Sequence, residues 1–221
     1  VKAGDVIIVD GTDGEVIINP SPAIKREFNS KKERYQNYKK ELKKIARLKS
    51  LTLDGVDFIP LANIELPEEV DTAFSFGAEG VGLFRSEFIY LRRPTLPSEE
   101  DHLSIYRQMA RKTYPRPVYI RTIDIGGEKS LPWLNIEKEP NPALGLRAIR
   151  FSLRNRELFR TQIRAILKAS DRHNVRLMVP MITELEEVVE LKTMVEEVKD
   201  ELRQNKIPFD EEIPIGVMIE V

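Results

Sequence analysis

The chain has 221 residues, enough for one large domain or for one domain with an appendage. Its 35 basic and 36 acidic residues give a net charge of −1, which excludes a uniformly basic protein that binds nucleic acid or an anionic membrane through its overall charge. It has no cysteine, which excludes disulfides and thiolate metal sites in these residues, and no run approaches the ~18 apolar residues of a membrane span. The first ten residues do not resemble a signal peptide because acidic residues interrupt a short apolar run, so we expect a soluble, cytoplasmic protein.

The chain begins with two short apolar runs, Val6–Val9 and Glu15–Ile18, on either side of a turn-rich Asp-Gly-Thr-Asp-Gly segment. This pattern predicts a β-hairpin. Because two short strands are only marginally stable alone, we expect the hairpin to belong to a sheet whose other strands lie outside these residues.

A long polar helix is expected between about Pro22 and Leu51. Its apolar residues recur at steps of three or four and form a narrow stripe, namely Phe28, Tyr35, Tyr38, Leu42, Ile45 and Leu48. The lysine-rich remainder indicates a solvated face rather than a nucleic-acid patch, because acidic residues are interleaved. The helix is either a linker between two domains or a helix that lies on its own domain, and the sequence does not separate the two.

From Asp54 onward, strand-like and helix-like segments alternate. Strands are expected at 58–64, 81–84, 118–123, 175–182 and 215–221, and helices at 67–76, from Ser98, from about Asn155 and at 184–203. Asp101 follows Ser98 at the spacing of a capping box. The last helix is expected to bury Leu185, Val188, Val189, Val195, Val198 and Leu202. Because parallel strands need crossovers, the alternation predicts an α/β protein with a parallel sheet of about five units.

The segment Val118-Tyr-Ile-Arg-Thr-Ile-Asp-Ile-Gly-Gly-Glu-Lys129 places Arg121 and Asp124 just after an apolar strand and ahead of a Gly-Gly turn. Parallel sheets bind ligands at the carboxyl ends of their strands, and glycine pairs mark places where the backbone turns or approaches a ligand closely. These residues therefore predict a binding site, to which Lys129 could add positive potential. The alternative is a structural ion pair in which Asp124 orients Arg121.

Arginines recur in two further segments. Arg85 ends an apolar strand, with Glu87 two residues later, and Arg147 and Arg150 have the spacing of neighbours on one helix face. A guanidinium can form two hydrogen bonds with one phosphate or carboxylate. Arginines from several loops therefore predict a site for a small, multiply charged anion.

Four motifs together identify a resemblance to a known family: GVGLFRSEF, YIRTIDIGGEK, NPALGLRAIRFSL and IPIGVMIEV. In this order and spacing they resemble enzyme I of the phosphoenolpyruvate (PEP):sugar phosphotransferase system, over essentially the whole chain. The resemblance implies a parallel (β/α)8 barrel of the TIM type, here truncated after about its fifth strand. It further implies that residues 1–20 end a swivelling phosphohistidine domain, 21–52 form a linker helix and 53–221 form an incomplete PEP-binding barrel.

The resemblance also implies residue roles. Arg85 and Arg121 match the two arginines that clamp the phosphoryl group of PEP, Arg147 matches a further arginine of the same site, and Glu220 matches one of two carboxylates that hold Mg²⁺. The other carboxylate, the phosphorylated histidine and a catalytic cysteine of the family have no counterpart here. We therefore assign no catalytic residue and expect these residues alone to lack turnover.

The two histidines of the chain, His102 and His173, do not match the phosphohistidine motif of the family. Both are expected to be surface residues on helix-like segments.

The implied reaction moves the phosphoryl group of PEP to a histidine of the swivelling domain and then to the phosphocarrier protein HPr, which serves sugar uptake. The resemblance also implies a homodimer formed through the barrel. Two alternatives stay open. One is the same barrel in a pyruvate phosphate dikinase or phosphoenolpyruvate synthase, and the other is a non-catalytic module for PEP binding or dimerisation.

Overall fold

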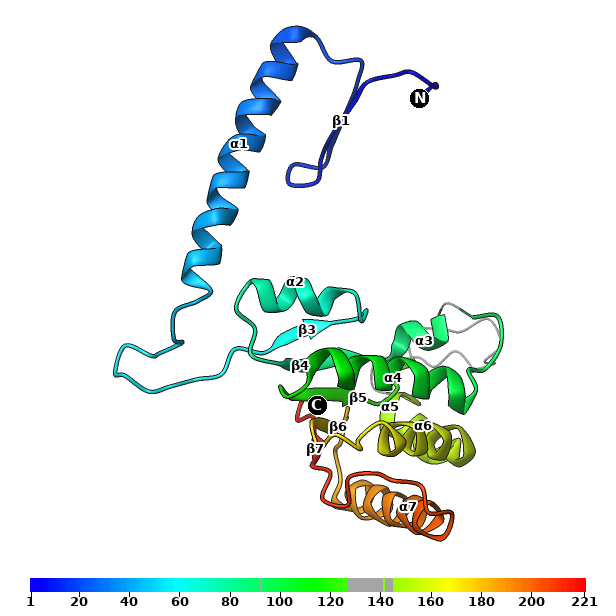
Figure 1. The fold of residues 1–221 in the computed structure, drawn as a ribbon. Helices are drawn as coiled ribbons and strands as arrows, with labels where there is room; N and C mark the ends of the chain where they lie inside the picture. The colour runs from blue at the N-terminus through cyan, green and yellow to red at the C-terminus, as the bar shows by residue number, and fades with distance from the viewer. Residues whose placement is uncertain (92, 127–140, 142–144) are drawn as a thin grey trace. The chain divides into compact units, whose positions relative to one another are not determined.

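The computed structural model describes residues 1–91, 93–126, 141 and 145–221. Gly127 and Lys129 of the glycine-rich segment lie outside the described residues. The chain forms two compact units, residues 1–49 and 50–221, and each is described by itself. Figure 1 shows the helices and strands of both.

The first unit contains the predicted hairpin and the predicted helix. Strands β1 (Ile7–Asp10) and β2 (Glu15–Ile18) pair antiparallel, which confirms the hairpin. Helix α1 (Pro22–Ile45) begins with Ser21, whose hydroxyl accepts a hydrogen bond from the Ile24 amide at 3.3 Å. Within α1, all of which the structure describes, no residue is buried.

The predicted end of this helix near Leu51 is wrong. Helix α1 stops at Ile45, and Leu51 instead pairs with Asp57 in an isolated antiparallel bridge. The carbonyl of Ser50 also accepts a hydrogen bond from the Phe58 amide at 3.1 Å. The helical spacing of apolar residues therefore extends past the end of α1, but the residues from Ser50 onward form a local antiparallel pairing and not a helix.

The second unit is an α/β fold with a five-stranded parallel sheet, as predicted. Its strands lie in the order β3 (Ala62–Ile64), β4 (Val81–Arg85), β5 (Val118–Arg121), β6 (Val175–Val179) and β7 (Ile215–Val217). The helices described between and around them are α2 (Glu69–Ser75), α3 (Glu87–Leu91), α4 (Glu99–Thr113), α5 (Ala148–Arg154), α6 (Arg156–Lys168) and α7 (Leu185–Gln204).

The order of the strands in the sheet is the order of the strands in the chain. Crossovers between parallel strands are almost always right-handed, so an order that never reverses places the crossover helices on one face. Helices α4, α6 and α7 pack side by side in this way (Figure 1). Along β5, Val118 and Ile120 are fully buried and Tyr119 between them is only partly buried, which fits a sheet with one covered face.

Several predicted boundaries differ from the structure. The strand expected at 58–64 is confined to β3, because Pro60 interrupts the run and Phe58 and Ile59 are exposed. Strand β6 ends at Val179, since the following Pro180 has no amide hydrogen for the ladder. Leu185 and Val189 were expected in the core but are exposed, and α7 packs through its later apolar residues.

The capping box of α4 is confirmed. The Ser98 hydroxyl accepts a hydrogen bond from the Asp101 amide at 3.2 Å, and the Asp101 carboxylate accepts one from the Ser98 amide at 2.8 Å.

Among the helices that the structure describes, none combines the length and the apolar character needed to cross a membrane.

Candidate functional site

Arg85 and Arg121 are brought together by the register of the sheet. They are the last residues of β4 and β5, and the parallel pairing places their Cα atoms opposite each other. Phe84 and Ile120, the residues before them, are fully buried and anchor both strand ends in the core. The two guanidiniums therefore leave neighbouring strands at the carboxyl edge of the sheet, where ligands of parallel sheets bind.

Arg121 belongs to a buried ion-pair cluster. Its Nη2 donates to Glu87 Oε1 at 2.6 Å and lies 3.5 Å from Asp124 Oδ2. All three residues are buried, and only 9% of the Arg121 side chain is exposed. Both carboxylates contact the same nitrogen, Nη2, and so hold that end of the guanidinium, while its Nε is buried without a hydrogen-bond partner among the described residues.

Arg147 is held by the same aspartate. Its Nε donates to Asp124 Oδ1 at 2.8 Å and its Nη2 to Asp124 Oδ2 at 3.1 Å, a two-pronged pair. The Asp124 hydrogen bonds raise the pKa of Arg147, and the charges of Glu220 and Glu87 act in the same direction. Asp124 thus joins the Arg121 segment to the Arg147 segment.

The prediction that Arg147 and Arg150 share one helix face is wrong. Arg147 is the N-cap of α5, with extended backbone angles, and only Arg150 lies inside the helix. The Arg150 Nη1 donates to the carbonyl of Gly145 at 3.3 Å, so it braces the loop before α5. Helix α5 starts at Ala148, one residue after Arg147, so the three-residue helical spacing assumed for Arg147 and Arg150 does not apply.

Arg85 is the most accessible of the three arginines. Its side chain is 41% exposed, and its Nη2 forms an ion pair with the carboxylate of Glu65, which is 48% exposed and follows β3. The Arg85 Nε is buried without a hydrogen-bond partner in the part of the chain that the structure describes. Since exposed ion pairs contribute little, a phosphate could replace Glu65 at this guanidinium at small cost.

Glu220 lies beyond the sheet rather than at the end of its last strand. Strand β7 ends at Val217, and the predicted strand to 221 is wrong because Pro180 closes the ladder of the neighbouring strand. Glu220 Oε1 accepts a hydrogen bond from the Met181 amide at 2.9 Å, which fixes it after β6. Its charge raises the pKa of Arg147, so it acts electrostatically on the arginine site.

Two acidic partners of the site, Glu65 and Glu87, have no assigned role in the sequence reasoning. Glu87 was noted only as a carboxylate near Arg85, but it pairs with Arg121, which is 34 residues away in the chain. No local signal in the sequence identifies this pair, because it depends on the parallel register of β4 and β5.

A buried polar network connects α4, α6 and the segments that follow β4 and β5. Gln162 of α6 accepts a hydrogen bond from the Ile123 amide at 3.0 Å and donates to Ser86 Oγ at 3.1 Å and to Tyr106 Oη at 2.9 Å. Ser86 Oγ donates to the Arg121 carbonyl at 2.7 Å. Tyr106 of α4 lies with its Oη 3.1 Å from Nδ1 of His102, one turn earlier in the same helix, so His102 extends the network along α4.

The expectation that His102 is a surface residue is therefore wrong. It is 1% exposed and lies between the rings of Tyr90 and Tyr106, at 5.1 and 5.6 Å between ring centroids. His173, by contrast, has a side chain that is 72% exposed, as expected, but it lies in the turn between α6 and β6 and not in a helix. His102 lies four residues before Tyr106, on the apolar face of α4, and that spacing is the signal for its burial.

Protonation of His102 is expected to destabilise the fold. Burial lowers the pKa of His102 from 6.5 to about 4 because desolvation disfavours the charged ring. Because the pKa of His102 is lower in the folded state than in the unfolded state, the folded chain keeps its full stability above about pH 6.5, where the ring is neutral in both states. The free energy of unfolding then declines as the pH falls toward 4. The shift corresponds to about 3 kcal/mol, at about 1.4 kcal/mol for each pKa unit.

Urea unfolding between pH 7 and 4.5 measures this effect. The wild type and a His173→Gln variant should lose stability as the pH falls, and His102→Gln should lose much less. Equal pH slopes for the wild type and His102→Gln would contradict the assignment.

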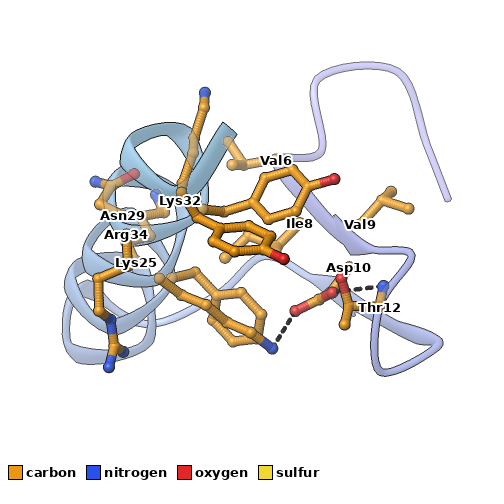
Figure 2. A pocket seen from close by; sticks show the side chains of 13 residues that line it. Val6, Ile8, Val9, Asp10, Thr12, Lys25, Asn29, Lys32 and Arg34 are labelled. Atoms are coloured by element: carbon orange, nitrogen blue, oxygen red, sulfur yellow. Dashed lines mark hydrogen bonds and ion pairs between the residues drawn. The ribbon is translucent and has the colours of Figure 1, made fainter. Parts of the chain in front are cut away.

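A groove of about 880 Å³ lies in the first unit, between the hairpin and α1 (Figure 2). Tyr35, Tyr38 and Phe28 supply aromatic walls, and Lys31 forms ion pairs with Asp10 and Asp13. None of the four predicted site residues lines this groove. Because the predicted site residues lie elsewhere, this groove is not the site of the predicted chemistry, in spite of its size.

Comparison with known proteins gives the family. A family model described as PEP-utilising enzyme, PEP-binding domain, matches residues 39–221. A phosphoenolpyruvate-protein phosphotransferase of Geobacillus stearothermophilus is 42% identical over 221 residues, which are 100% of this chain and 38% of that protein. The proteins of the same name from Priestia megaterium and Staphylococcus carnosus are 41% and 39% identical over the whole chain, which covers 39% of each.

The chain thus spans about two fifths of the length of the curated relatives that it matches, 38% and 39% in these cases. The family model covers most of the chain, including every described strand of the five-stranded sheet and all three arginines. The chain belongs to the family of PEP-utilising enzymes and contains residues of their PEP-binding domain.

Proposed function

We propose that this chain is the PEP-binding part of a phosphoenolpyruvate-protein phosphotransferase, and that Arg85, Arg121 and Arg147 bind its substrate. The observation that carries the proposal is the register pairing of Arg85 with Arg121 at the carboxyl edge of the sheet. PEP carries a phosphate and a carboxylate, and guanidiniums recognise both with paired hydrogen bonds. The names of the relatives favour the phosphotransferase over a dikinase or a synthase.

The arginines are held in place before any substrate binds. Glu87 and Asp124 fix Arg121, and Asp124 fixes Arg147, so neither guanidinium has to be ordered by the ligand. Phosphoryl transfer passes through a loose transition state with charge spread over oxygen atoms, and preorganised donors stabilise such charge. The anion would displace Glu65 from Arg85, because Glu65 is exposed whereas Glu87 and Asp124 are buried.

Glu220 is the residue that we propose for Mg²⁺. Magnesium prefers oxygen ligands and often combines one or two carboxylates with substrate oxygens and water. Glu220 is held after β6 by the Met181 amide and its charge raises the pKa of Arg147, which supports such a role, although the described residues contain no cluster of three metal-ligating side chains. When bound, the ion would neutralise phosphate charge; Glu220 would supply one carboxylate ligand, and the second carboxylate that the family resemblance implies has no counterpart among these residues.

The fold supports a wider assignment. A parallel sheet whose strands keep their chain order and have one covered face is what part of a (β/α)8 barrel would give. We propose that residues 53–221 are an incomplete barrel of this kind, that 21–52 link it to a swivelling phosphohistidine domain, and that 1–20 belong to that domain. Transfer to HPr, a homodimer through the barrel and a cytoplasmic location are part of the same proposal for the whole protein.

Titration calorimetry of PEP into the chain tests this function. Arg85→Ala is expected to weaken binding 10- to 100-fold, because hydrogen bonds to charged groups contribute about 1.5–3 kcal/mol. Arg111→Ala, which removes an exposed arginine of α4, should bind as the wild type does. Mg²⁺ should change the affinity little, since Glu220 is the only carboxylate that we assign to the ion. Equal affinities for Arg85→Ala and Arg111→Ala would refute the arginine site.

A further inference from the structure

The segments that carry Arg85 and Arg121 are joined by one buried amide side chain, that of Gln162. Gln162 Nε2 donates to Ser86 Oγ, and Ser86 lies between Arg85 and Glu87. Gln162 Oε1 accepts from the amide of Ile123, two residues after Arg121. Ser86 completes the connection, because its hydroxyl donates to the Arg121 carbonyl. Gln162 thus contacts the segments that follow both β4 and β5.

Every polar atom of the Gln162 amide has a partner. Its oxygen accepts one backbone hydrogen bond, and its two N–H groups go to Ser86 and Tyr106. The acceptor role for the Ile123 amide fixes which end of the side chain is oxygen. All these groups are fully buried, where a hydrogen bond left unmade costs about 1–3 kcal/mol. The network therefore has one satisfied arrangement, which sets the relative positions of the two strand ends.

We propose that Gln162 is a positioning residue for the anion site, acting through Ser86 and the Ile123 amide on the spacing of Arg85 and Arg121. The proposal rests on the proposed function, since it concerns the geometry with which these arginines meet PEP. A shift of either strand end moves a guanidinium relative to the phosphate, and paired hydrogen bonds weaken steeply with misalignment. Gln162 does not itself reach the ligand in this account.

Asn174 provides a matched control. It is also a buried amide side chain, and its Nδ2 donates to the Ala110 carbonyl, to Thr113 Oγ1 and to the Arg116 carbonyl at 3.0–3.1 Å. Asn174 precedes β6, so it lies at the amino edge of the sheet, away from the arginines. Replacing either Gln162 or Asn174 by leucine removes three hydrogen bonds from the core. Only the change at Gln162 affects the carboxyl edge of the sheet, where the arginines lie.

The experiment compares Gln162→Leu, Asn174→Leu and the wild-type chain under conditions in which urea unfolding shows all three to be folded. PEP affinity is measured by calorimetry, and hydrogen exchange of backbone amides is measured by NMR. Gln162→Leu is expected to weaken PEP binding about tenfold and to speed exchange at Ile123 and its neighbours. Asn174→Leu is expected to lose similar stability with unchanged affinity and unchanged exchange at Ile123.

The outcomes separate this inference from the function on which it rests. If the wild type binds PEP and Gln162→Leu binds it equally well, the positioning role is refuted and the proposed function stands. If both leucine variants lose affinity alike, the effect is general destabilisation and the inference is again refuted. If the wild type does not bind PEP, the proposed function fails, and the positioning role fails with it.

Discussion

Glu87→Ala is expected to destabilise the second unit by about 3–5 kcal/mol, the usual cost of removing one partner of a buried ion pair. Glu87 and Arg121 are both buried, and their side chains are 7% and 9% exposed. Without Glu87, the guanidinium keeps Asp124 at 3.5 Å, but Asp124 already binds Arg147 through both of its oxygens. A charge with little compensation then remains in the core.

Urea unfolding of Glu87→Ala and of Glu190→Ala measures this effect against a matched pair. Glu190 forms an ion pair with Arg156 in which both side chains are nearly half exposed. Its removal should change the free energy of unfolding by less than about 1 kcal/mol. Similar losses in the two variants would show that Glu87 does not neutralise Arg121 in the folded chain.

This ion pair shows where sequence reasoning stops. The apolar runs around Val118 and Val175 predicted their strands, and Ser98 with Asp101 predicted the start of α4, because these signals are local. The partner of Arg121 could not be found in this way. Glu87 follows a different strand, and the two meet only through the parallel register of β4 and β5.

His102 and Leu185 illustrate the same limit in opposite directions. A polar residue was expected at the surface, but the face of α4 that carries His102 packs against Tyr90, so the ring is buried. An apolar residue was expected in the core, but Leu185 begins α7 at the exposed end of its stripe. Helical periodicity gives the buried face, whereas the packing partners decide how far along the helix that face is covered.

Arg85, Arg121 and Arg147 were grouped by their motifs, and the structure places each of them relative to an acidic partner. The motifs did not show how exposed these acidic partners are: Glu65 is exposed, whereas Glu87 and Asp124 are buried. We therefore expect one exchangeable contact and two permanent ones, a distinction that residue types alone do not carry.

Gly126→Ala is expected to destabilise the second unit by about 2–5 kcal/mol, from backbone strain and from overpacking. Gly126 has a φ of +127°, which side-chain-bearing residues rarely adopt. A Cβ there would lie 2.5 Å from the Leu146 carbonyl oxygen and 2.8 Å from the Arg147 Cα. Both are backbone atoms, so they cannot move aside as a flexible side chain would.

Gly216→Ala is the control for this change, since its added Cβ would meet the end of the flexible Met178 side chain at 3.3 Å. Gly216→Ala should alter stability by less than about 1 kcal/mol, whereas Gly126→Ala should also weaken PEP binding because it pushes the Arg147 segment away. If Gly126→Ala had the same unfolding free energy as the wild type, the Gly126 segment and the Arg147 segment could move apart without cost, which would contradict this prediction.

Gly126, the first glycine of the Gly-Gly pair, was expected to allow either a turn or the close approach of a ligand. We infer instead that it admits the backbone of Arg147, which the Ala148 amide fixes by donating to the Ile125 carbonyl at 3.2 Å. Its small size therefore sets the distance between Arg147 and the segment that carries Arg121 and Asp124.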